Sequence, residues 1–337
     1  MSVATVGTEL ADLVDEAVLR HLGSEPTRRV VIAMSKDDNP KATVLVFRAG
    51  GRNPALAIKA ATTPGAQASV EREAQALREL QRLDPGLVGG TVPRLVELYG
   101  HAGHTLLVAT AQGGMPMSTG YHRWRHTASS HQVGTDFRDA AAWLERLAGV
   151  ASLTHEVEGW AHRLTTRWPG DGVATSCGAT AERLEDELRT DVGSVVHGDF
   201  WCGNVMRERG VVSGVVDWEH ARFGADPVRD RVRFALGYTL YLDRHSRPGV
   251  HVAGHRGLSA GAWGNPVRYL LTGRGWYPDL VAAFVGEGLA ATGRSRALWR
   301  PALLLGLVEV ATLADHPEFA RQHLDLVAEL SPGVVLR

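Results

Sequence analysis

The sequence predicts an α+β chain of two lobes, a small antiparallel β lobe with one main helix and a larger lobe rich in helices. Two observations support this prediction. Short strand-like runs separated by turn-rich segments dominate the first third of the chain. Later segments instead show apolar residues at the three- and four-residue spacing of amphipathic helices. The predicted lobes are residues 1–110 and 118–337, joined by a connector over 111–117.

The first lobe begins with a helical pattern over Thr8–Leu22. The expected strands are Arg29–Met34, Thr43–Phe47, Ala55–Ala60, Arg94–Leu98 and Thr105–Thr110. Between the third and fourth strands, Pro64 starts a helix that continues to about Leu83, because apolar residues then recur on one helical face. Gln112–Pro116, with two glycines and a proline, ends this pattern and predicts the connector.

The second lobe is expected to be mostly helical. Helices are predicted near Phe137–Ala151, Ala181–Thr190, Pro227–Tyr241, Asp279–Ala291, Arg296–Ala314 and Phe319–Leu330. Two β segments interrupt them, a short strand at Val195–Val196 and a longer one at Val205–Val216. The longer segment contains Arg209-Gly210 near its middle, which predicts that it folds back as a hairpin.

The composition limits the classes of function. Of the 337 residues, 44% are hydrophobic and 22% are charged, which is typical of a folded globular protein. A net charge of −1 gives no basic field for nucleic acid or for an anionic membrane. Two cysteines cannot form a disulfide framework, and the longest apolar run, Ala302–Ala314, is too short to span a membrane. Acidic residues near the N-terminus argue against a signal peptide. We therefore expect a cytoplasmic monomer or homodimer that binds neither nucleic acid nor membrane.

Lysine is rare in this chain. Of the 36 basic residues, only Lys36, Lys41 and Lys59 are lysines. Where arginine is the usual cation, a lysine indicates a place that needs a compact point charge instead of a guanidinium fork. Lys59 also lies within the apolar strand Ala55–Ala60, where a charge is unexpected. The alternative is a surface lysine that extends its ammonium group into solvent.

The densest cluster of polar residues follows the strand Val195–Val196. A turn over His197-Gly198-Asp199 leaves a carboxylate at the strand end, and Asn204 and Asp217 flank the predicted hairpin. A hairpin symmetric about residues 209–211 would place Asn204 opposite Asp217, with Cβ atoms about 5 Å apart. Such oxygen donors suit Mg²⁺, and a free aspartate beside them suits a base that accepts a hydroxyl proton. The alternative is a loop in which polar residues gather without a function.

This pattern resembles the aminoglycoside phosphotransferase family of the protein-kinase-like superfamily, which also contains choline kinases. The resemblance is specific over about residues 195–234, and its motif residues are His197-Gly198-Asp199, Asn204, Asp217-Trp218-Glu219, Gly224-Ala225-Asp226-Pro227 and Asp230. It implies a bilobal kinase-like fold and an enzyme that transfers a phosphoryl group from ATP or GTP to a hydroxyl group of a small molecule. By motif position, it implies that Asp199 is the catalytic base and that Asn204 and Asp217 bind Mg²⁺. It implies supporting roles for His197 and Asp230.

The same resemblance assigns nucleotide-binding residues to the first lobe. Lys59 would hold the phosphates and would need a carboxylate partner from the following helix. Glu73 fits better than Glu71, because it lies beside the apolar face of that helix. Ser35 begins the loop expected near the phosphates, and the nucleotide base is expected to contact backbone groups of Ala109 and Ala111.

The charge of the second lobe suggests the class of acceptor. Residues 244–300 contain eight arginines and two acidic residues, a net charge of +6. A polycationic aminoglycoside needs carboxylates around its ammonium groups, so this segment favours a neutral or anionic sugar, glycoside or metabolite. The alternatives are an aminoglycoside-modifying phosphotransferase and an inactive kinase-like nucleotide-binding module. A protein kinase is disfavoured, because the chain lacks Gly-x-Gly-x-x-Gly and His-Arg-Asp motifs.

Overall fold

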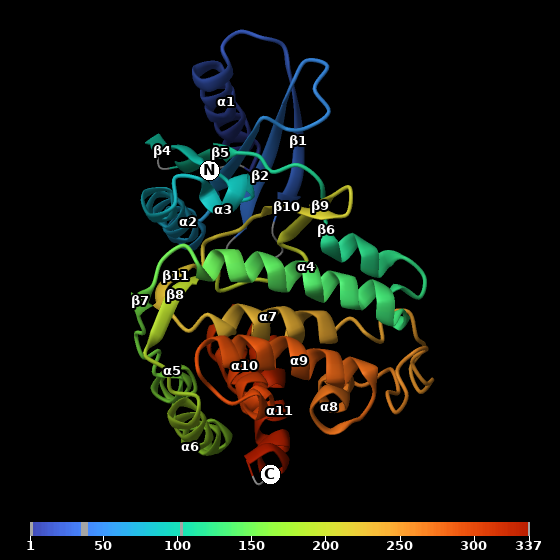
Figure 1. The fold of residues 1–337 in the computed structure, drawn as a ribbon. Coiled ribbons are helices and arrows are strands. Elements are labelled where there is room, and N and C mark those ends of the chain that lie inside the picture. Colours follow the sequence, from blue (N-terminus) through green and yellow to red (C-terminus); the bar gives the residue numbers. More distant parts are fainter. Residues whose placement is uncertain (1–2, 35–39, 102–103, 336–337) are drawn as a thin grey trace. The chain divides into compact units, whose positions relative to one another are not determined.

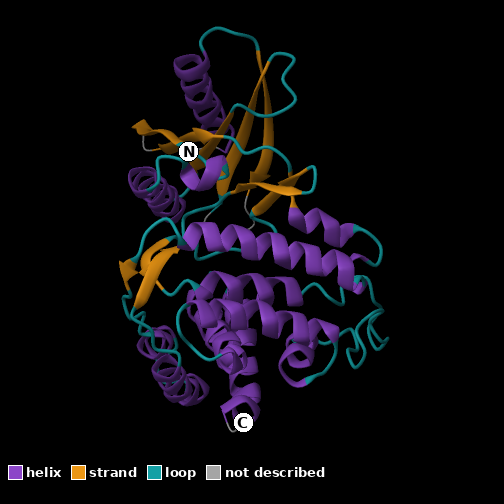
Figure 2. Ribbon diagram, in the orientation of Figure 1, coloured by secondary structure: helices purple, strands orange, loops and turns teal. Residues whose placement is uncertain are grey.

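A computed structural model describes residues 3–34, 40–101 and 104–335 of the chain. The chain forms two compact units. The first contains Met1–Met115 and Val205–Ala221, and the second contains Pro116–Asn204 and Arg222–Arg337. Figure 2 shows that strands predominate in the first unit and helices in the second, which confirms the predicted α+β class. The lobe boundaries predicted at 111–117 remain a prediction. Residues 205–221 come after part of the second unit in sequence, but they belong to the first unit.

The first unit is built on one antiparallel sheet of five strands in the order β1-β2-β3-β5-β4 (Figure 1). The strands are β1 (Thr27–Met34), β2 (Lys41–Arg48), β3 (Leu56–Ala61), β4 (Leu95–His101) and β5 (His104–Thr110). All five strands predicted from the sequence are present, with ends that differ by a few residues.

One face of this sheet packs against helix α1 (Val3–Leu22). Alternate residues of β2 and β3 point to this face, and together with the helix they form a hydrophobic core of Leu13, Val14, Ala17, Val18, Ala42, Val44, Val46, Leu56, Ile58, Ala60, Leu106 and Val108. Because side chains alternate along a strand, the residues between these core positions point to the opposite face. Lys59, between Ile58 and Ala60, is one of them.

The main helix of the first unit is α2 (Pro64–Leu83), with the bounds that the sequence predicts. It starts where it does because the Thr63 hydroxyl accepts a hydrogen bond from the Ala66 N–H group, and Pro64 occupies the first turn, where no backbone donor is needed. A single turn, α3 (Leu87–Gly90), follows. Helix α2 packs against β3, β4 and β5.

Residues 205–221 contribute a hairpin to the first unit, formed by β9 (Val205–Glu208) and β10 (Val211–Val215). Arg209 and Gly210 both have positive φ angles, 51° and 86°, as a two-residue hairpin turn of the primed type requires. The two-residue strand β6 (Met115–Pro116) pairs beside β9.

The predicted register of this hairpin is wrong. Placing Asn204 opposite Asp217 requires Val205 to pair with Val216, but Val205 pairs with Val215. The pairing shifts between Val212 and Gly214, where the second strand carries a bulge. Gly214 follows this bulge, where the chain passes close to Gln112. A Cβ atom on residue 214 would lie 2.5 Å from Gln112 Cβ, so a side chain does not fit there.

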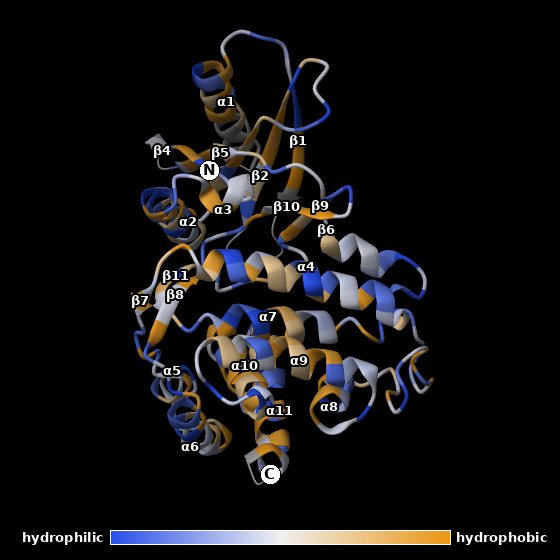
Figure 3. Ribbon diagram, in the orientation of Figure 1, coloured by the Kyte–Doolittle hydropathy of each residue, from blue (hydrophilic) through white to orange (hydrophobic). Residues whose placement is uncertain are grey.

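The second unit is mainly helical (Figure 2). Its elements are η1 (Met117–His122), η2 (His126–Ala128), α4 (Ser130–Ala148), β7 (Leu153–Thr154), α5 (Trp160–Arg167), α6 (Gly172–Glu187), β8 (Val192–Val196), β11 (Arg222–Ala225), α7 (Val228–Thr239), α8 (Asn265–Thr272), α9 (Trp276–Ala291), η3 (Arg296–Leu298), α10 (Trp299–Leu313) and α11 (Pro317–Val335). Hydrophilic and hydrophobic residues alternate along α4 (Figure 3), and α7 packs against α4, α9 and α10. No helix within the described ranges is long and apolar enough to cross a membrane.

Two helices of this unit, α5 and α8, were not predicted, because eight residues are too few to show a helical period clearly. Helix α6 begins at Gly172, well before the predicted start at Ala181. The reason is a cap: the Asp171 carboxylate accepts hydrogen bonds from the N–H groups of Val173 and Ala174, at 2.8 and 3.0 Å.

Candidate active site

Lys59 occupies the face of the first unit's sheet that α1 does not cover. Its neighbours in sequence, Ile58 and Ala60, are completely buried in the core on the other face. Only 8% of Lys59 is exposed, so its ammonium group must be compensated by nearby charges.

Glu73 of α2 supplies the first of these charges. Both carboxylate oxygens of Glu73 accept hydrogen bonds from Lys59 Nζ, at 2.7 Å for Oε1 and 2.6 Å for Oε2. The competing candidate, Glu71, is exposed and accepts instead a hydrogen bond from Gln67 Nε2 at 2.9 Å. Two residues along a helix change the direction of a side chain by more than half a turn, so only one of these glutamates can face the sheet.

Asp217 supplies the second charge. It follows β10 and adopts a φ angle of 67°, in the left-handed region that aspartate tolerates better than most residues. Its Oδ1 contacts Lys59 Nζ directly. Burial alone would lower the pKa of Lys59, but the carboxylates of Asp217 and Glu73 outweigh burial and hold the pKa above its ordinary value. The ammonium group therefore stays charged, and it links the sheet, the helix and the segment after the hairpin.

A second lysine contacts the same segment. Lys41 Nζ contacts the carboxylate of Glu219, two residues after Asp217, and donates a hydrogen bond to Ser69 Oγ at 3.0 Å. The Ser69 hydroxyl also donates to Glu219. Burial would raise the pKa of Glu219, but the hydrogen bonds from Lys41 and Ser69 hold it below its ordinary value. The rarity of lysine was the only sign of this contact in the sequence.

In the second unit, a buried aspartate shapes the turn that carries Asp199. Asp230 of α7 is 1% exposed, and it accepts hydrogen bonds from the N–H groups of His197 and Gly198, at 2.7 and 2.9 Å. Burial raises the pKa of Asp230 to about 7 against the opposing effect of these hydrogen bonds. His197 is completely buried, and its Nδ1 accepts a hydrogen bond from the Asp199 N–H group at 3.2 Å. Both residues contact the backbone of the turn.

The carboxylate of Asp199 is held at both oxygens. Asn204 Nδ2 donates to Asp199 Oδ2 at 3.0 Å, and it donates also to the Asp199 carbonyl at 3.0 Å. Arg233 donates to the other oxygen, Oδ1, through Nε at 2.9 Å and Nη2 at 2.7 Å. About a quarter of the Asp199 side chain, 24%, is exposed, so the carboxylate can still be reached.

Sequence reasoning missed Arg233. A signal existed: Arg233 lies three residues after Asp230 on α7, so the two side chains leave neighbouring positions on one face of the helix. Asp230 holds the backbone of the turn, and Arg233 holds the carboxylate that the turn carries.

The donors fit a magnesium ion by their chemistry. Asp217 offers a carboxylate whose side chain is 45% exposed. Asn204 commits its Nδ2 group to Asp199, so its Oδ1 is the amide atom left to act as a ligand. Mg²⁺ prefers carboxylate and amide oxygens and needs only one or two from the protein. Clusters of three or more His, Cys, Asp or Glu that could hold a metal do not occur among residues 3–34, 40–101 and 104–335.

The other predicted contacts lie in the first unit. Ser35 falls outside the described residues. Ala109 lies in the interior strand β5, paired with Ala57 on one side and Leu95 on the other. The Ala111 N–H group donates to the Ala55 carbonyl at 3.3 Å. The part of Ala109 and Ala111 in binding a nucleotide base stays a prediction.

Comparisons with known proteins identify the family and the fold. Residues 40–264 match the model of the phosphotransferase enzyme family. The fold is similar to that of a thermostable mutant of aminoglycoside phosphotransferase APH(4)-Ia, solved with ADP and hygromycin B, with a TM-score of 0.52, 11% identity and coverage of 94% of this chain and 98% of that one.

Two further solved structures are also similar. Aminoglycoside-3'-phosphotransferase of type VIII gives a TM-score of 0.49 at 21% identity, over 86% of this chain and 98% of that one. Macrolide 2'-phosphotransferase MphH from Brachybacterium faecium gives 0.48 at 16% identity, over 87% and 95%. No curated protein sequence matches the chain. Because the family model covers well over half of the sequence, the chain belongs to the phosphotransferase enzyme family, with its kinase-like fold.

Proposed function

We propose that this phosphotransferase transfers the γ-phosphate of ATP or GTP to a hydroxyl group of a small neutral or anionic molecule. The observation that carries the proposal is the buried ammonium group of Lys59, which contacts Glu73 and Asp217. Such a charge, fixed on a strand and held by a helix carboxylate, suits the negative phosphates of a nucleotide. The matched family supports phosphoryl transfer in general.

Each residue has a distinct role in the proposed reaction. Lys59 would bind the phosphates, and Asn204 and Asp217 would hold Mg²⁺, which neutralises phosphate charge when bound. Asp199 would accept the proton of the acceptor hydroxyl as that oxygen bonds to the γ-phosphorus. The bond from the γ-phosphorus to the bridging oxygen then breaks, and the nucleoside diphosphate leaves. Lys59 and Asp217 belong to the first unit, and Asp199 and Asn204 belong to the second.

The charge of residues 244–300 supports a neutral or anionic acceptor. Of the eight arginines in residues 244–300, Arg268 pairs with Glu329 and Arg294 with Asp226, both from outside the segment. The remaining excess is still positive, which suits a sugar, a glycoside or an acidic metabolite better than a polycation. Aminoglycoside phosphotransferase APH(4)-Ia was solved with hygromycin B, so an aminoglycoside acceptor is the second candidate.

The experiment is a screen of hydroxyl compounds with ATP or GTP and Mg²⁺, measured as ADP or GDP release. We expect turnover with sugars or sugar acids and little with kanamycin. Asp199→Asn is the matched control, because the amide keeps the shape and cannot accept the proton. It should lower kcat by ~10²–10⁴ while nucleotide affinity is retained.

Two outcomes would overturn the proposal. The first is turnover by Asp199→Asn at the wild-type rate, which would remove Asp199 as the base. The second is nucleotide binding without phosphoryl transfer to any compound, which would favour the inactive binding module instead. Efficient turnover of kanamycin alone would support phosphoryl transfer but would contradict the proposal of a neutral or anionic acceptor.

A further inference from the structure

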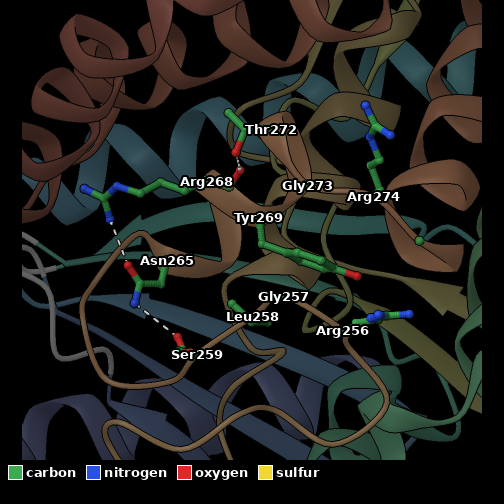
Figure 4. A pocket seen from close by; sticks show the side chains of 11 residues that line it. Arg256, Gly257, Leu258, Ser259, Asn265, Arg268, Tyr269, Thr272, Gly273 and Arg274 are labelled. Atoms are coloured by element: carbon green, nitrogen blue, oxygen red, sulfur yellow. Dashed lines mark hydrogen bonds between the residues drawn. The ribbon is translucent and has the colours of Figure 1, made fainter.

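The second unit contains a cavity whose lining includes none of the residues assigned above to phosphoryl transfer. It has a volume of about 700 Å³ and lies between α8, the segment before it and the turn that leads into α9. Its lining residues are Arg256, Gly257, Leu258, Ser259, Asn265, Arg268, Tyr269, Thr272, Gly273, Arg274 and Gly275 (Figure 4). Three of these are arginines and none is acidic.

The three arginines differ in what balances their charge. Arg268 is neutralised by Glu329, which accepts from Nε at 2.6 Å and from Nη2 at 2.7 Å. Arg268 also donates to Asn265 Oδ1 at 3.3 Å, and Figure 4 shows its guanidinium turned to one side of the cavity. Arg256 and Arg274 are exposed, and neither has an ion pair with any residue in the described ranges. Two uncompensated positive charges therefore line the cavity.

Tyr269 offers a hydroxyl group to the same cavity. Only 5% of the residue is exposed, and its hydroxyl makes no hydrogen bond to any residue that the structure describes. The hydroxyl oxygen is not among the buried polar side-chain atoms that lack a partner, so a ligand can reach it. Figure 4 shows this hydroxyl directed to the side of the cavity on which Arg256 and Arg274 stand, away from the Arg268 guanidinium.

The local backbone leaves space in front of that hydroxyl. Gly275 has a φ of 131°, a conformation that residues with a side chain rarely adopt. A Cβ atom at this position would lie 3.5 Å from the Tyr269 hydroxyl oxygen, so a larger side chain would cover it. Burial, with the Asp279 carboxylate, raises the pKa of Tyr269, so the hydroxyl remains a donor at neutral pH.

We propose that this cavity binds the phosphate or carboxylate group of a small molecule, through the guanidinium groups of Arg256 and Arg274 and the hydroxyl of Tyr269. Guanidinium groups pair with such oxyanions through two parallel hydrogen bonds, and a neutral hydroxyl adds a third donor. The inference does not depend on the residues proposed to transfer the phosphoryl group. Arg256 and Arg274 do belong to the segment 244–300 from which the acceptor class was proposed, so in that respect it rests on the proposed function.

The test is calorimetric titration of the full chain with inorganic phosphate, in the presence of saturating ADP and Mg²⁺ so that the proposed nucleotide site is filled. We expect wild type to bind phosphate, Arg256→Gln/Arg274→Gln to bind at least tenfold more weakly, and Tyr269→Phe to bind several-fold more weakly. Arg247→Gln is the matched control, because it removes one exposed arginine of the same segment outside the cavity. It should bind like wild type.

Binding by the double variant within twofold of wild type, an equal loss in Arg247→Gln, or no binding by wild type would overturn the proposal. Tyr269→Phe removes only one oxygen atom, so it keeps the test decisive if the double variant does not fold. Acceptor kinetics identify the source of the anion. A raised acceptor KM in the double variant assigns the anion to the acceptor, and an unchanged KM assigns it to a separate ligand.

Discussion

The two units hold their candidate site residues in opposite ways. In the first unit, the side chains of Lys59 and Glu73 are 11% and 3% exposed, and one ammonium group serves two carboxylates. In the second unit, Asp199 is partly exposed and is matched by one guanidinium group and one neutral amide. A buried ammonium group and a buried carboxylate depend on each other for charge compensation. A surface carboxylate held by its neighbours depends on them for orientation. Substitutions in the first unit should therefore lower stability and nucleotide affinity, whereas substitutions in the second unit should lower kcat.

The sharpest way to break this comparison is Lys59→Met. The change leaves Glu73 buried without a positive partner, which typically costs ~3–5 kcal/mol of the free energy of unfolding. ATP affinity should fall by at least about tenfold, because a charge–phosphate contact is lost. Urea unfolding and equilibrium ATP binding measure the two effects.

The control for this variant is Lys59→Met/Glu73→Gln, which removes the unpaired charge. We expect the double variant to recover most of the stability and none of the ATP affinity. If Lys59→Met binds ATP as wild type does, Lys59 has a structural role only, and the contrast between the units disappears.

A second prediction concerns pH. The pKa of Asp230 is raised by burial from 3.8 to about 7, so the folded protein binds this proton more tightly than the unfolded chain does. The stabilisation is fully present below about pH 3.8 and is lost as the pH rises through about 7. It amounts to about 4 kcal/mol across that interval.

Urea unfolding of wild type and Asp230→Asn, from pH 4 to pH 8, measures this effect. The stability of the variant relative to wild type should improve as the pH rises. Asp12→Asn, exposed on α1, is the control and should follow wild type. A stability difference between Asp230→Asn and wild type that is constant with pH would contradict the prediction.

The smallest expected effect is at Arg233. Arg233→Gln frees Oδ1 of Asp199, so the carboxylate can rotate, and kcat should fall about tenfold, or about 1.4 kcal/mol. Arg233→Lys keeps the charge but has fewer hydrogen-bond donors, so its kcat should lie between those of wild type and Arg233→Gln. The nucleotide KM should not change in either variant.

Steady-state kinetics with Arg222→Gln, exposed on β11, as the control separate this positioning role from a general loss of charge. An unchanged kcat in Arg233→Gln would show that the contact with Asp199 does not orient the carboxylate. A parallel rise in nucleotide KM would place Arg233 at the nucleotide instead.

The sequence was most informative where local periodicity determines direction. Strand alternation turns Lys59 away from Ile58, and helix periodicity turns Glu73 and not Glu71 toward the sheet, so this pair could be predicted. Contacts set by tertiary packing could not. Lys41 meets Glu219, 178 residues away, and the register of the 205–215 hairpin depends on a bulge beside Gln112. Neither is encoded in a local pattern.

The division of the chain between the two units has a consequence for its synthesis. Residues 205–221 complete the first unit, but the ribosome makes them only after residues 116–204 of the second. Lys59 can meet Glu73 early, whereas Asp217 and Glu219 emerge much later. In many proteins an N-terminal domain finishes folding before the next domain is made. The first unit of this chain cannot do so, because its last segment is made after residues 116–204. A gene split after residue 115 would yield a fragment in which Lys59 lacks Asp217 and Lys41 lacks Glu219.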